Sequence, residues 1–388
     1  MFVDEFNKGV RIKPLKYAIS DCPHMTIEPN RTCDVMCESC YTLDKSHVKS
    51  IEEIKEEIDL AVCRRNLQTV TLLGGEPTLH PDINDIIAYV KGKKKICQLL
   101  TNGLNILKNG SFLDDLAAAG VDRIVVHVDS GQKHVHRDID ATRHALFEKL
   151  ERKRIPFSLA ITIYEDYRKQ IPSLSRRYSS YRYFDGILAV LARDPLPPRI
   201  QNAGLCDEYR SIADELDVEP VAYIPSNIED DYVSWLIYFY FIDENTGRTY
   251  GLSPVTDRIC RWIYRLFRGH HLFLVLLPPS LSVLSFLVTG FADVLGHPKK
   301  AGSFLHLLFH SRFGRSIRFH YIAIQTPPER TENGKIRFCY RCPDATIRNG
   351  KVTPVCIADQ MNPFIENGTE PSFSNELCES IYRHLGEQ

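Results

Sequence analysis

Residues 24–191 alternate between short apolar runs and amphipathic segments, and this alternation restricts the fold more than any other feature of the sequence. A hydrophobic period of two predicts a strand, and a period near 3.6 predicts a helix. Strands that alternate with helices predict an α/β fold with a parallel sheet, whose functional groups lie at the carboxyl ends of the strands. The predicted strands are residues 24–29, 69–73, 96–101, 123–129, 157–163 and 186–191, and the predicted helices are residues 51–65, 83–93, 112–119, 141–152 and 168–177.

Cys33, Cys37 and Cys40 follow the first predicted strand at spacings of four and three residues. Thiolates are the usual ligands of iron–sulfur clusters, and closely spaced cysteines on a loop allow one short segment to hold one corner of a cluster. Three thiolates leave one iron of a four-iron cluster open to a small molecule. The cysteine pattern by itself is also compatible with a zinc knuckle or with three separate buried thiols.

A glycine-rich segment, Gly74-Gly75-Glu76-Pro77-Thr78, directly follows the second predicted strand. Its glycines allow the backbone to approach a ligand closely, and Glu76 offers a carboxylate to an ammonium group. Asn102 follows the third strand, where it is equally explained as a turn residue that tolerates left-handed backbone angles. Three histidines near the same rim are expected to be ordinary rim or surface residues, and they are His127, His134 and His136.

The cysteine loop after the first strand and the glycine-rich segment after the second resemble the radical S-adenosylmethionine (radical SAM) superfamily. The resemblance covers about residues 24–191 and implies a partial (β/α)6 barrel of the TIM type. It implies a [4Fe-4S] cluster on Cys33, Cys37 and Cys40, whose open iron is chelated by the amino and carboxylate groups of S-adenosylmethionine. The implied chemistry is reductive cleavage of this cofactor to methionine and a 5′-deoxyadenosyl radical that abstracts a substrate hydrogen, with a flavodoxin or ferredoxin as electron donor.

The same resemblance implies roles for several other residues. The segment from Gly74 to Thr78 would hold the amino group of the cofactor, and Asp129 and Ser130 would reach its ribose or carboxylate. Members of the family often carry an aromatic residue just before the third cysteine, whereas this chain has Ser39 there and Tyr41 after Cys40. The residue that contacts the adenine therefore stays open. A non-catalytic iron–sulfur carrier or zinc module is disfavoured, because a closed cluster needs no ammonium site.

Composition limits the function and location of the chain. A net charge of −1 argues against a nucleic-acid-binding protein that works through bulk charge. Twelve cysteines, with no apolar signal segment among the first residues, indicate a reducing, cytoplasmic location. Only residues 1–23 precede the first strand, so a leader-binding domain, and with it peptide maturation, is not expected.

At 388 residues the chain exceeds one average domain, and we expect four parts. A proline-rich run at residues 194–198 marks one boundary, after which a helix at 206–216 and a β-hairpin at 235–252 are predicted. The four parts are an N-terminal segment at 1–23, the partial barrel at 24–194, an insert at 195–318 and a C-terminal extension at 319–388.

Residues 258–318 contain nine Lys or Arg and a single acid, Asp293. The stretch 258–268 places four arginines on one side of a helix and Ile259, Trp262, Ile263 and Leu266 on the other. Residues 272–292 carry no charge, although Pro278 and Pro279 interrupt them, and a third apolar helix is predicted at 303–309. Basic and apolar helices of this kind are typical of a peripheral element on a membrane surface, with packing as core or a membrane span as alternatives.

This insert suggests a lipid or another apolar substrate, with apolar surface near the substrate entrance. The alternative keeps the radical chemistry but assigns a soluble sugar or aminocyclitol-type intermediate of a natural product, with the insert as ordinary core.

A second group of cysteines lies near the end of the chain. Cys339 and Cys342 precede Asn349-Gly350, a strong signal for a tight hairpin that would bring Cys356 back to them. The arrangement loosely resembles the auxiliary-cluster extensions called SPASM and twitch, and an auxiliary iron–sulfur cluster is expected, with structural zinc or unmetallated thiols as alternatives. Cys378, Cys260 or a substrate atom is a candidate fourth ligand. The remaining cysteines are expected to be plain thiols, and they are Cys22, Cys63, Cys97 and Cys206.

Overall fold

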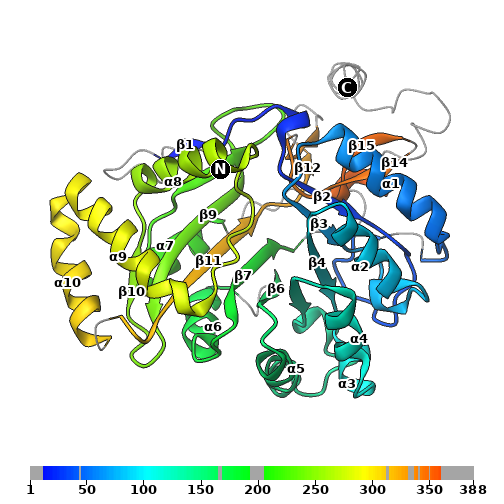
Figure 1. Cartoon of the computed structure of the whole chain (residues 1–388), viewed down its shortest axis with the longest axis horizontal. Helices are drawn as coiled ribbons and strands as arrows, with labels where there is room; N and C mark the ends of the chain where they lie inside the picture. The colour runs from blue at the N-terminus through cyan, green and yellow to red at the C-terminus, as the bar shows by residue number, and fades with distance from the viewer. Residues whose placement is uncertain are drawn as a thin grey trace.

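A mixed sheet of eleven strands runs through the molecule, with helices on its outer side (Figure 1). The computed structural model describes residues 12–42, 45–164, 168–192, 205–311, 314–330, 336–339, 341–348 and 350–359. The proline-rich run at 194–198, Asn349 and Cys378 lie outside these described residues.

Six parallel strands form the first part of the sheet in chain order, as predicted. Their side chains are nearly all buried because helices cover one face and the barrel interior the other. This confirms the α/β partial barrel. The strands are β2 (His24–Ile27), β3 (Thr69–Leu72), β4 (Ile96–Thr101), β5 (Arg123–His127), β6 (Phe157–Ile163) and β7 (Phe184–Leu191).

Each predicted helix of the barrel is present. In α1 the Ser50 hydroxyl accepts a hydrogen bond from the Glu53 N–H, and the Glu53 carboxylate accepts one from the Ser50 N–H, which satisfies two otherwise free donors at the helix start. A short helix, α3 (Leu104–Lys108), was not predicted. The others are α1 (Ile51–Arg64), α2 (Ile83–Gly92), α4 (Phe112–Ala119), α5 (Ile139–Lys153) and α6 (Ile171–Tyr178).

The sheet continues beyond the sixth barrel strand. Strand β11 (Ile317–Gln325) pairs in parallel with β7, and β9 (Val233–Asp243) pairs with β11 in the antiparallel direction. The predicted hairpin forms from β9 and β10 (Thr249–Gly251), and the predicted helix is α7 (Leu205–Leu216). Two further strands complete this edge, β8 (Ala222–Pro225) and β1 (Lys13–Pro14).

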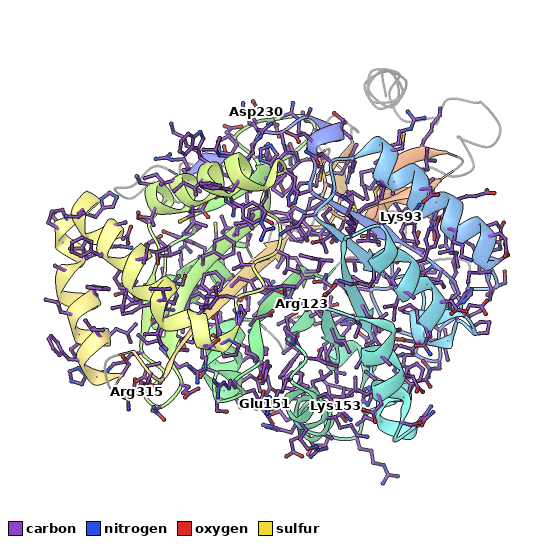
Figure 2. The ribbon with its side chains drawn as sticks, viewed as in Figure 1. Lys93, Arg123, Glu151, Lys153, Asp230 and Arg315 are labelled. Carbon is purple, nitrogen blue, oxygen red and sulfur yellow. The ribbon has the colours of Figure 1, made fainter. Side chains whose placement is uncertain are left out.

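Buried Arg123 forms hydrogen bonds that link several strands of the sheet near their amino ends. Arg123, the first residue of β5, donates hydrogen bonds to Gln98 on β4, to Asp185 on β7 and to the Tyr321 hydroxyl on β11. Figure 2 shows Arg123 at the centre of the molecule, whereas Lys153 and Asp230 lie at its edge. Arg123 thus connects β4, β5, β7 and β11, and Asp185 balances its buried charge.

Three helices of the insert flank the sheet beside β9 and β11 (Figure 1). One face of α9 is buried through Phe286, Gly290 and Asp293. The Asp293 carboxylate accepts hydrogen bonds from the Tyr250 hydroxyl at 2.9 Å and the Thr256 hydroxyl at 2.7 Å, and it pairs with Lys300. The helices are α8 (Pro254–Arg268), α9 (Pro279–Gly296) and α10 (Ala301–His310).

By length and composition α9 could cross a membrane, and among the described residues it is the one helix of which this holds. Its buried face instead packs against Phe241 and Phe304, and its one acid is satisfied by protein groups. Packing as core, which was an alternative to the predicted membrane-surface element, is therefore found for one face of α9, and the other face is exposed.

The C-terminal extension adds two small hairpins. Strands β14 (Ala345–Arg348) and β15 (Lys351–Pro354) pair with Arg348 opposite Lys351, which leaves a two-residue turn and confirms the predicted hairpin. Strand β14 lies beside β2, so the extension covers the open edge of the barrel (Figure 1). The other pair is β12 (Glu329–Arg330) and β13 (Ile336–Arg337).

Candidate active site at the carboxyl ends of the strands

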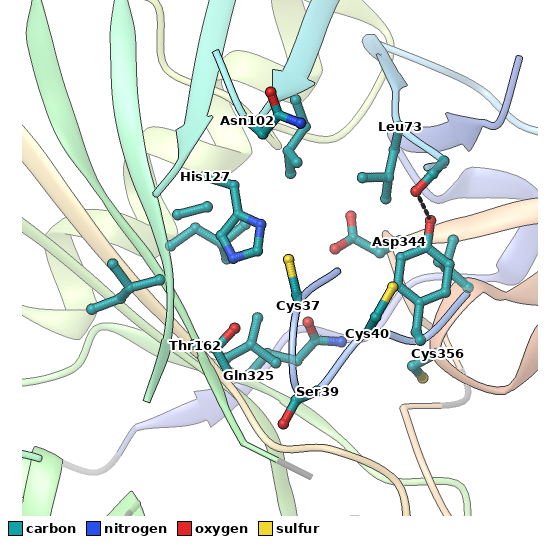
Figure 3. A pocket seen from close by; sticks show the side chains of 18 of the residues that line it. Cys37, Ser39, Cys40, Leu73, Asn102, His127, Thr162, Gln325, Asp344 and Cys356 are labelled. Atoms are coloured by element: carbon teal, nitrogen blue, oxygen red, sulfur yellow. Dashed lines mark hydrogen bonds between the residues drawn. The ribbon is translucent and has the colours of Figure 1, made fainter. Parts of the chain in front are cut away.

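A cavity opens at the carboxyl ends of the parallel strands and encloses about 1270 Å³ of space, part of it open to solvent. The strands contribute residues at or just past their ends, from Leu73 after β3 to Gln325 of β11. Figure 3 shows Cys37, Cys40, Asn102 and His127 around this space. Eight of the predicted site residues line it together, and they are Cys33, Cys37, Cys40, Gly74, Gly75, Glu76, Asn102 and Cys356.

Backbone hydrogen bonds join the cysteine loop to the glycine-rich segment. The Gly75 N–H donates to the Asn30 carbonyl at 3.0 Å, and the Glu76 N–H donates to the Thr32 carbonyl at 2.7 Å. A Cβ atom on Gly75 would lie 2.1 Å from the Thr32 oxygen, so only glycine fits this close approach. The two loops that carry the predicted ligands therefore form one unit.

The three thiols are suited to metal binding. Burial raises the pKa of the Cys37 thiol to about 12, opposed by a hydrogen bond from the Gln132 side-chain amide, whose nitrogen lies 3.3 Å from Cys37 Sγ. Burial also raises the pKa of Cys33. Thiols in this setting keep their protons until a metal displaces them.

Cys33, Cys37 and Cys40 line one cavity together. Across the described residues, no three His, Cys, Asp or Glu side chains come close enough to hold one metal ion. The thiolates of a cluster lie farther apart than those around one ion, because several irons stand between them, so a cluster on these residues is compatible with the cavity.

The buried Glu76 carboxylate links the carboxyl ends of β3 and β4 through hydrogen bonds. Its Oε1 accepts hydrogen bonds from Thr78 and from the Thr101 hydroxyl, and its Oε2 accepts one from the Asn102 N–H at 2.7 Å. Burial raises the pKa of Glu76, and these hydrogen bonds oppose the rise. A carboxylate has about four acceptor positions. Oε2 thus retains one for an ammonium group, and that role of Glu76 stays a prediction.

Asn102 acts both as a turn residue and as a link to the cysteine loop. Its side-chain oxygen accepts a hydrogen bond from the Leu104 N–H at 2.9 Å, at the start of α3. Its amide donates to Asp34 at 2.7 Å, next to Cys33. The explanation of Asn102 through left-handed backbone angles is wrong, because the left-handed position is taken by Gly103 at φ +76°. Its position is compatible with a contact in the site.

Four predicted cofactor contacts do not line the cavity. The Asp129 carboxylate is fully buried and accepts hydrogen bonds from His127 Nε2 at 2.9 Å, the Gly131 N–H at 2.9 Å and the Thr162 N–H at 2.7 Å. Both carboxylate oxygens of Asp129 are therefore occupied by hydrogen bonds within the protein. Asp129 orients His127 and does not itself reach the cavity. The other residues absent from the lining are Pro77, Thr78 and Ser130.

Several lining residues were not predicted from the sequence. His127, which was expected to be an ordinary rim or surface residue, lines the cavity, and although burial lowers its pKa, the adjoining Asp129 charge raises it above the usual value. The Tyr41 hydroxyl oxygen lies 3.1 Å from the Gly74 carbonyl oxygen and 3.1 Å from a Glu28 carboxylate oxygen, and it can donate its proton to either. Gln132 could have been suspected, because it stands in the same segment after the fourth strand as Asp129.

The second cysteine group borders the same region. Cys356 and Asp344 line the cavity, and Cys339 and Cys342 are buried beside them, each with a pKa raised by burial. Cys260 is not part of this group, because it lies on α8 near Asp257 and Asp293. It is therefore not a fourth ligand in this structure.

Comparison with known proteins identifies the first part of the chain. Residues 27–165 match the Radical SAM superfamily, so the chain contains a radical SAM domain. A probable GTP 3′,8-cyclase of Pyrococcus abyssi is 29% identical over 133 residues, 34% of this chain and 38% of that protein. The subtilosin biosynthesis protein AlbA of Bacillus subtilis is 30% identical over 118 residues, 29% of this chain and 25% of that protein.

A third relative, pre-heme d1 synthase of Dinoroseobacter shibae, is 27% identical over 157 residues, 37% of this chain and 37% of that protein. The chain thus matches well under half the length of these relatives. Among solved structures, Streptococcus suis SuiB bound to S-adenosylmethionine aligns with 46% of this chain and 42% of that chain, at 16% identity and a TM-score of 0.40. Membership of the domain in the superfamily implies a [4Fe-4S] cluster and S-adenosylmethionine.

Proposed function

We propose that the radical SAM domain makes this chain an enzyme that reductively cleaves S-adenosylmethionine and removes a hydrogen atom from its substrate. The observation that carries the proposal is that Cys33, Cys37 and Cys40 line one cavity together with Gly74, Gly75 and Glu76. When bound, a [4Fe-4S] cluster with one open iron supplies the electron, and the cofactor supplies the 5′-deoxyadenosyl radical. A flavodoxin or ferredoxin is the proposed source of the electron.

The residues of the chain have distinct tasks in this proposal. Cys33, Cys37 and Cys40 hold the cluster, and the Gln132 amide stabilises the thiolate form of Cys37. Glu76 and the adjoining glycine backbone position the cofactor amino group. Side chains from β6 and β7 form an apolar wall that excludes water from the reacting atoms, and they are Ile161, Leu188, Val190 and Leu191.

Formation of 5′-deoxyadenosine tests this proposal. Reconstituted wild-type protein with dithionite and S-adenosylmethionine should form it, and the Cys37→Ala variant should give only the background level, because the cluster loses one of three thiolates. The Cys63→Ala variant is the matched control, since Cys63 is an exposed thiol on α1, and it should match wild type. Equal activity of the Cys37→Ala and wild-type proteins would contradict the proposal.

We further propose that residues 339–356 bind an auxiliary iron–sulfur cluster. The support is that Cys339 and Cys342 are buried with their side chains in direct interaction, and that the charge of Cys356 acts on Cys339. Such a cluster would border the same cavity as the radical SAM site, because Cys356 lines it.

The helices of the insert support a proposed membrane-surface location on the cytoplasmic side. Helix α8 presents its apolar side to solvent, with Trp262 66% exposed and Phe267 79% exposed. Its arginine side faces the protein, where Arg261 pairs with buried Asp257 and Arg265 pairs with Asp21. An amphipathic helix that is attached to its protein by charges and exposes its apolar side needs an apolar partner.

The neighbouring helices extend this apolar face. The exposed apolar residues of α9 and α10 are Leu281, Leu284, Leu287, Val288, Phe291, Leu295, Leu305 and Phe309. Exposed cations Arg268, Lys299 and Arg315 lie in the same region, and the acids of the three helices, Asp257 and Asp293, are both buried. Positive charge around an apolar face complements a bilayer with anionic headgroups, and we propose that such a bilayer is the partner.

A lipid or other apolar substrate is the proposed substrate class. The apolar wall at β6 and β7 supports it, because a sugar or aminocyclitol would leave its hydroxyl groups unpaired there. The expected apolar surface at the substrate entrance is not found, since no described residue of 254–311 lines the cavity. The segment between α8 and α9 instead meets the opposite end of the sheet, where Gln68 binds Leu274 and His24 stacks on Phe273.

Vesicle flotation tests the membrane proposal. Wild-type protein should float with phosphatidylcholine vesicles that contain phosphatidylglycerol, and less with phosphatidylcholine alone, because the exposed cations add attraction to anionic lipid. The Leu266→Ser/Phe267→Ser variant should lose most of this recovery. The control is Val135→Ser/Ile228→Ser, which removes two exposed apolar residues elsewhere and should float like wild type.

Equal recovery of the wild-type protein with and without vesicles would overturn the membrane proposal and favour the soluble-substrate alternative. A change of oligomeric state in the Leu266→Ser/Phe267→Ser variant, without vesicle binding by wild type, would also overturn it, because a second copy would then cover the face.

A further inference from the structure

Cys22, which stands outside both cysteine motifs, lies against the second one. It precedes β2 and is fully buried, with its Sγ 3.7 Å from the His24 carbonyl and 3.9 Å from the Cys342 carbonyl. The two residues are 320 positions apart in the chain. The fold therefore brings Cys22 to the turn between Cys339 and Cys342. From the sequence, Cys22 was expected to be a plain thiol.

Four thiols from three segments surround this place. The side chains of Cys339 and Cys342 interact directly, and the charges of both Cys356 and Cys22 act on Cys339. The Tyr17 hydroxyl donates a hydrogen bond to the Arg341 carbonyl at 3.1 Å, within the same turn. Cys22, Cys339 and Cys342 are free thiols in the structure, although their burial and proximity would suit a disulfide or a metal.

A buried cation independently indicates an anionic group at this place. Arg65 is 3% exposed, and its Nη1 donates hydrogen bonds to the His24 carbonyl at 2.8 Å and to the Cys342 carbonyl at 3.2 Å. Its Nε has no hydrogen-bond partner among the described residues. The Asp344 carboxylate supplies one negative charge near Arg65, and the free Nε can donate to a further anionic group, such as a cluster with four thiolates.

We propose that Cys22 is the fourth thiolate of an iron–sulfur cluster held with Cys339, Cys342 and Cys356. The inference rests on the auxiliary cluster proposed above and names its missing ligand. Arg65 would then balance the charge of the cluster and orient the Cys342 turn. The cluster would join Cys22, two residues before the first barrel strand, to the segment that carries the C-terminal hairpin.

Iron content separates this proposal from the radical SAM cluster. In a Cys33→Ala/Cys37→Ala/Cys40→Ala parent, anaerobic reconstitution with iron and sulfide should leave about four irons per chain, all in the second site. Adding Cys22→Ser should remove most of them. Adding Cys97→Ser is the matched control, because Cys97 is also fully buried but lies on β4, and the iron content should stay at the parent level.

Two further measurements keep the proposal falsifiable if the Cys22→Ser variant does not fold. The ⁵⁷Fe Mössbauer spectrum of the parent should show four sulfur-coordinated irons, and a distinct iron with a non-sulfur ligand would overturn the proposal. Adding Cys378→Ser to the parent should leave the iron content unchanged. Loss of iron in the Cys378→Ser variant, or full retention in a folded Cys22→Ser variant, would overturn the role of Cys22.

Failure at this site is distinguishable from failure of the main proposal. A parent that binds no iron would reject the auxiliary cluster. Formation of 5′-deoxyadenosine by the wild-type protein would still support the radical SAM site in that case.

Discussion

The Gly75→Ala variant should assemble little or no cluster at Cys33, Cys37 and Cys40 and should lose about 2–3 kcal/mol of stability. The added Cβ would stand 2.1 Å from the Thr32 carbonyl oxygen and 2.3 Å from the Arg31 carbonyl oxygen. Both obstacles are backbone atoms, which cannot turn aside as a flexible side chain can. The two loops must separate, and the 2.7 Å hydrogen bond from the Glu76 N–H to Thr32 must break.

Iron content after reconstitution and urea unfolding of the metal-free protein measure these two effects. The control is Gly92→Ala at the end of α2, where a Cβ would meet nothing within 4 Å. There the better helix propensity of alanine predicts a gain of at most about 1 kcal/mol and an unchanged iron content. A Gly75→Ala protein with wild-type iron content would show that the close contact between the loops is not needed.

The Arg348→Met variant should lose about 3–5 kcal/mol, the usual cost of leaving a buried charge without its partner. Arg348 forms an ion pair with Glu28, whose side chain is fully buried at the end of β2, and lies near Asp359, which pairs with Arg31. Methionine fills a similar volume but leaves the Glu28 carboxylate uncompensated. The hairpin of the extension would then detach from the edge of the barrel.

Urea unfolding monitored by circular dichroism measures this loss. Arg152→Met is the matched control, because Arg152 pairs with Glu148 on the exposed side of α5, and such pairs contribute about 0–1 kcal/mol. Adding Glu28→Gln to Arg348→Met should recover part of the stability, since the buried charge is then removed. A loss below about 1 kcal/mol in the Arg348→Met protein would contradict the importance of this ion pair.

The barrel could be predicted from the sequence because its signals are local. Strands and helices within residues 24–191 follow hydrophobic periods that a single chain segment contains, and the capping box at Ser50 marks a helix start directly. The place of β11 beside β7 was not predictable in the same way. Its partner is more than a hundred residues distant, and the register of Tyr321 opposite Gly186 is decided by tertiary packing.

The site residues that belong to a sequence motif could be predicted. Those that only tertiary contacts bring to the site could not. The three cysteines and Gly74–Glu76 were identified and do share a cavity. Asp129 stands at a strand end like the other site residues, yet its oxygens are used by His127 and by backbone donors. Cys22 offered no signal, because only the fold brings it to Cys342.

The orientation of helix α8 could not be predicted from the sequence either. Its sequence has an arginine side and an apolar side, but periodicity does not say which side meets the protein. The orientation is determined by buried Asp257 and half-buried Asp21, which pair with Arg261 and Arg265. The apolar side is thereby directed outward.

Quantifying 5′-deoxyadenosine together with methionine is the most direct test of whether this cavity cleaves S-adenosylmethionine. The anaerobic assay uses reconstituted wild-type protein whose iron content has been measured, with dithionite as reductant. We expect 5′-deoxyadenosine and methionine to form in equal amounts and only when reductant is present. Protein with a full cluster at Cys33, Cys37 and Cys40 that forms no 5′-deoxyadenosine would contradict it.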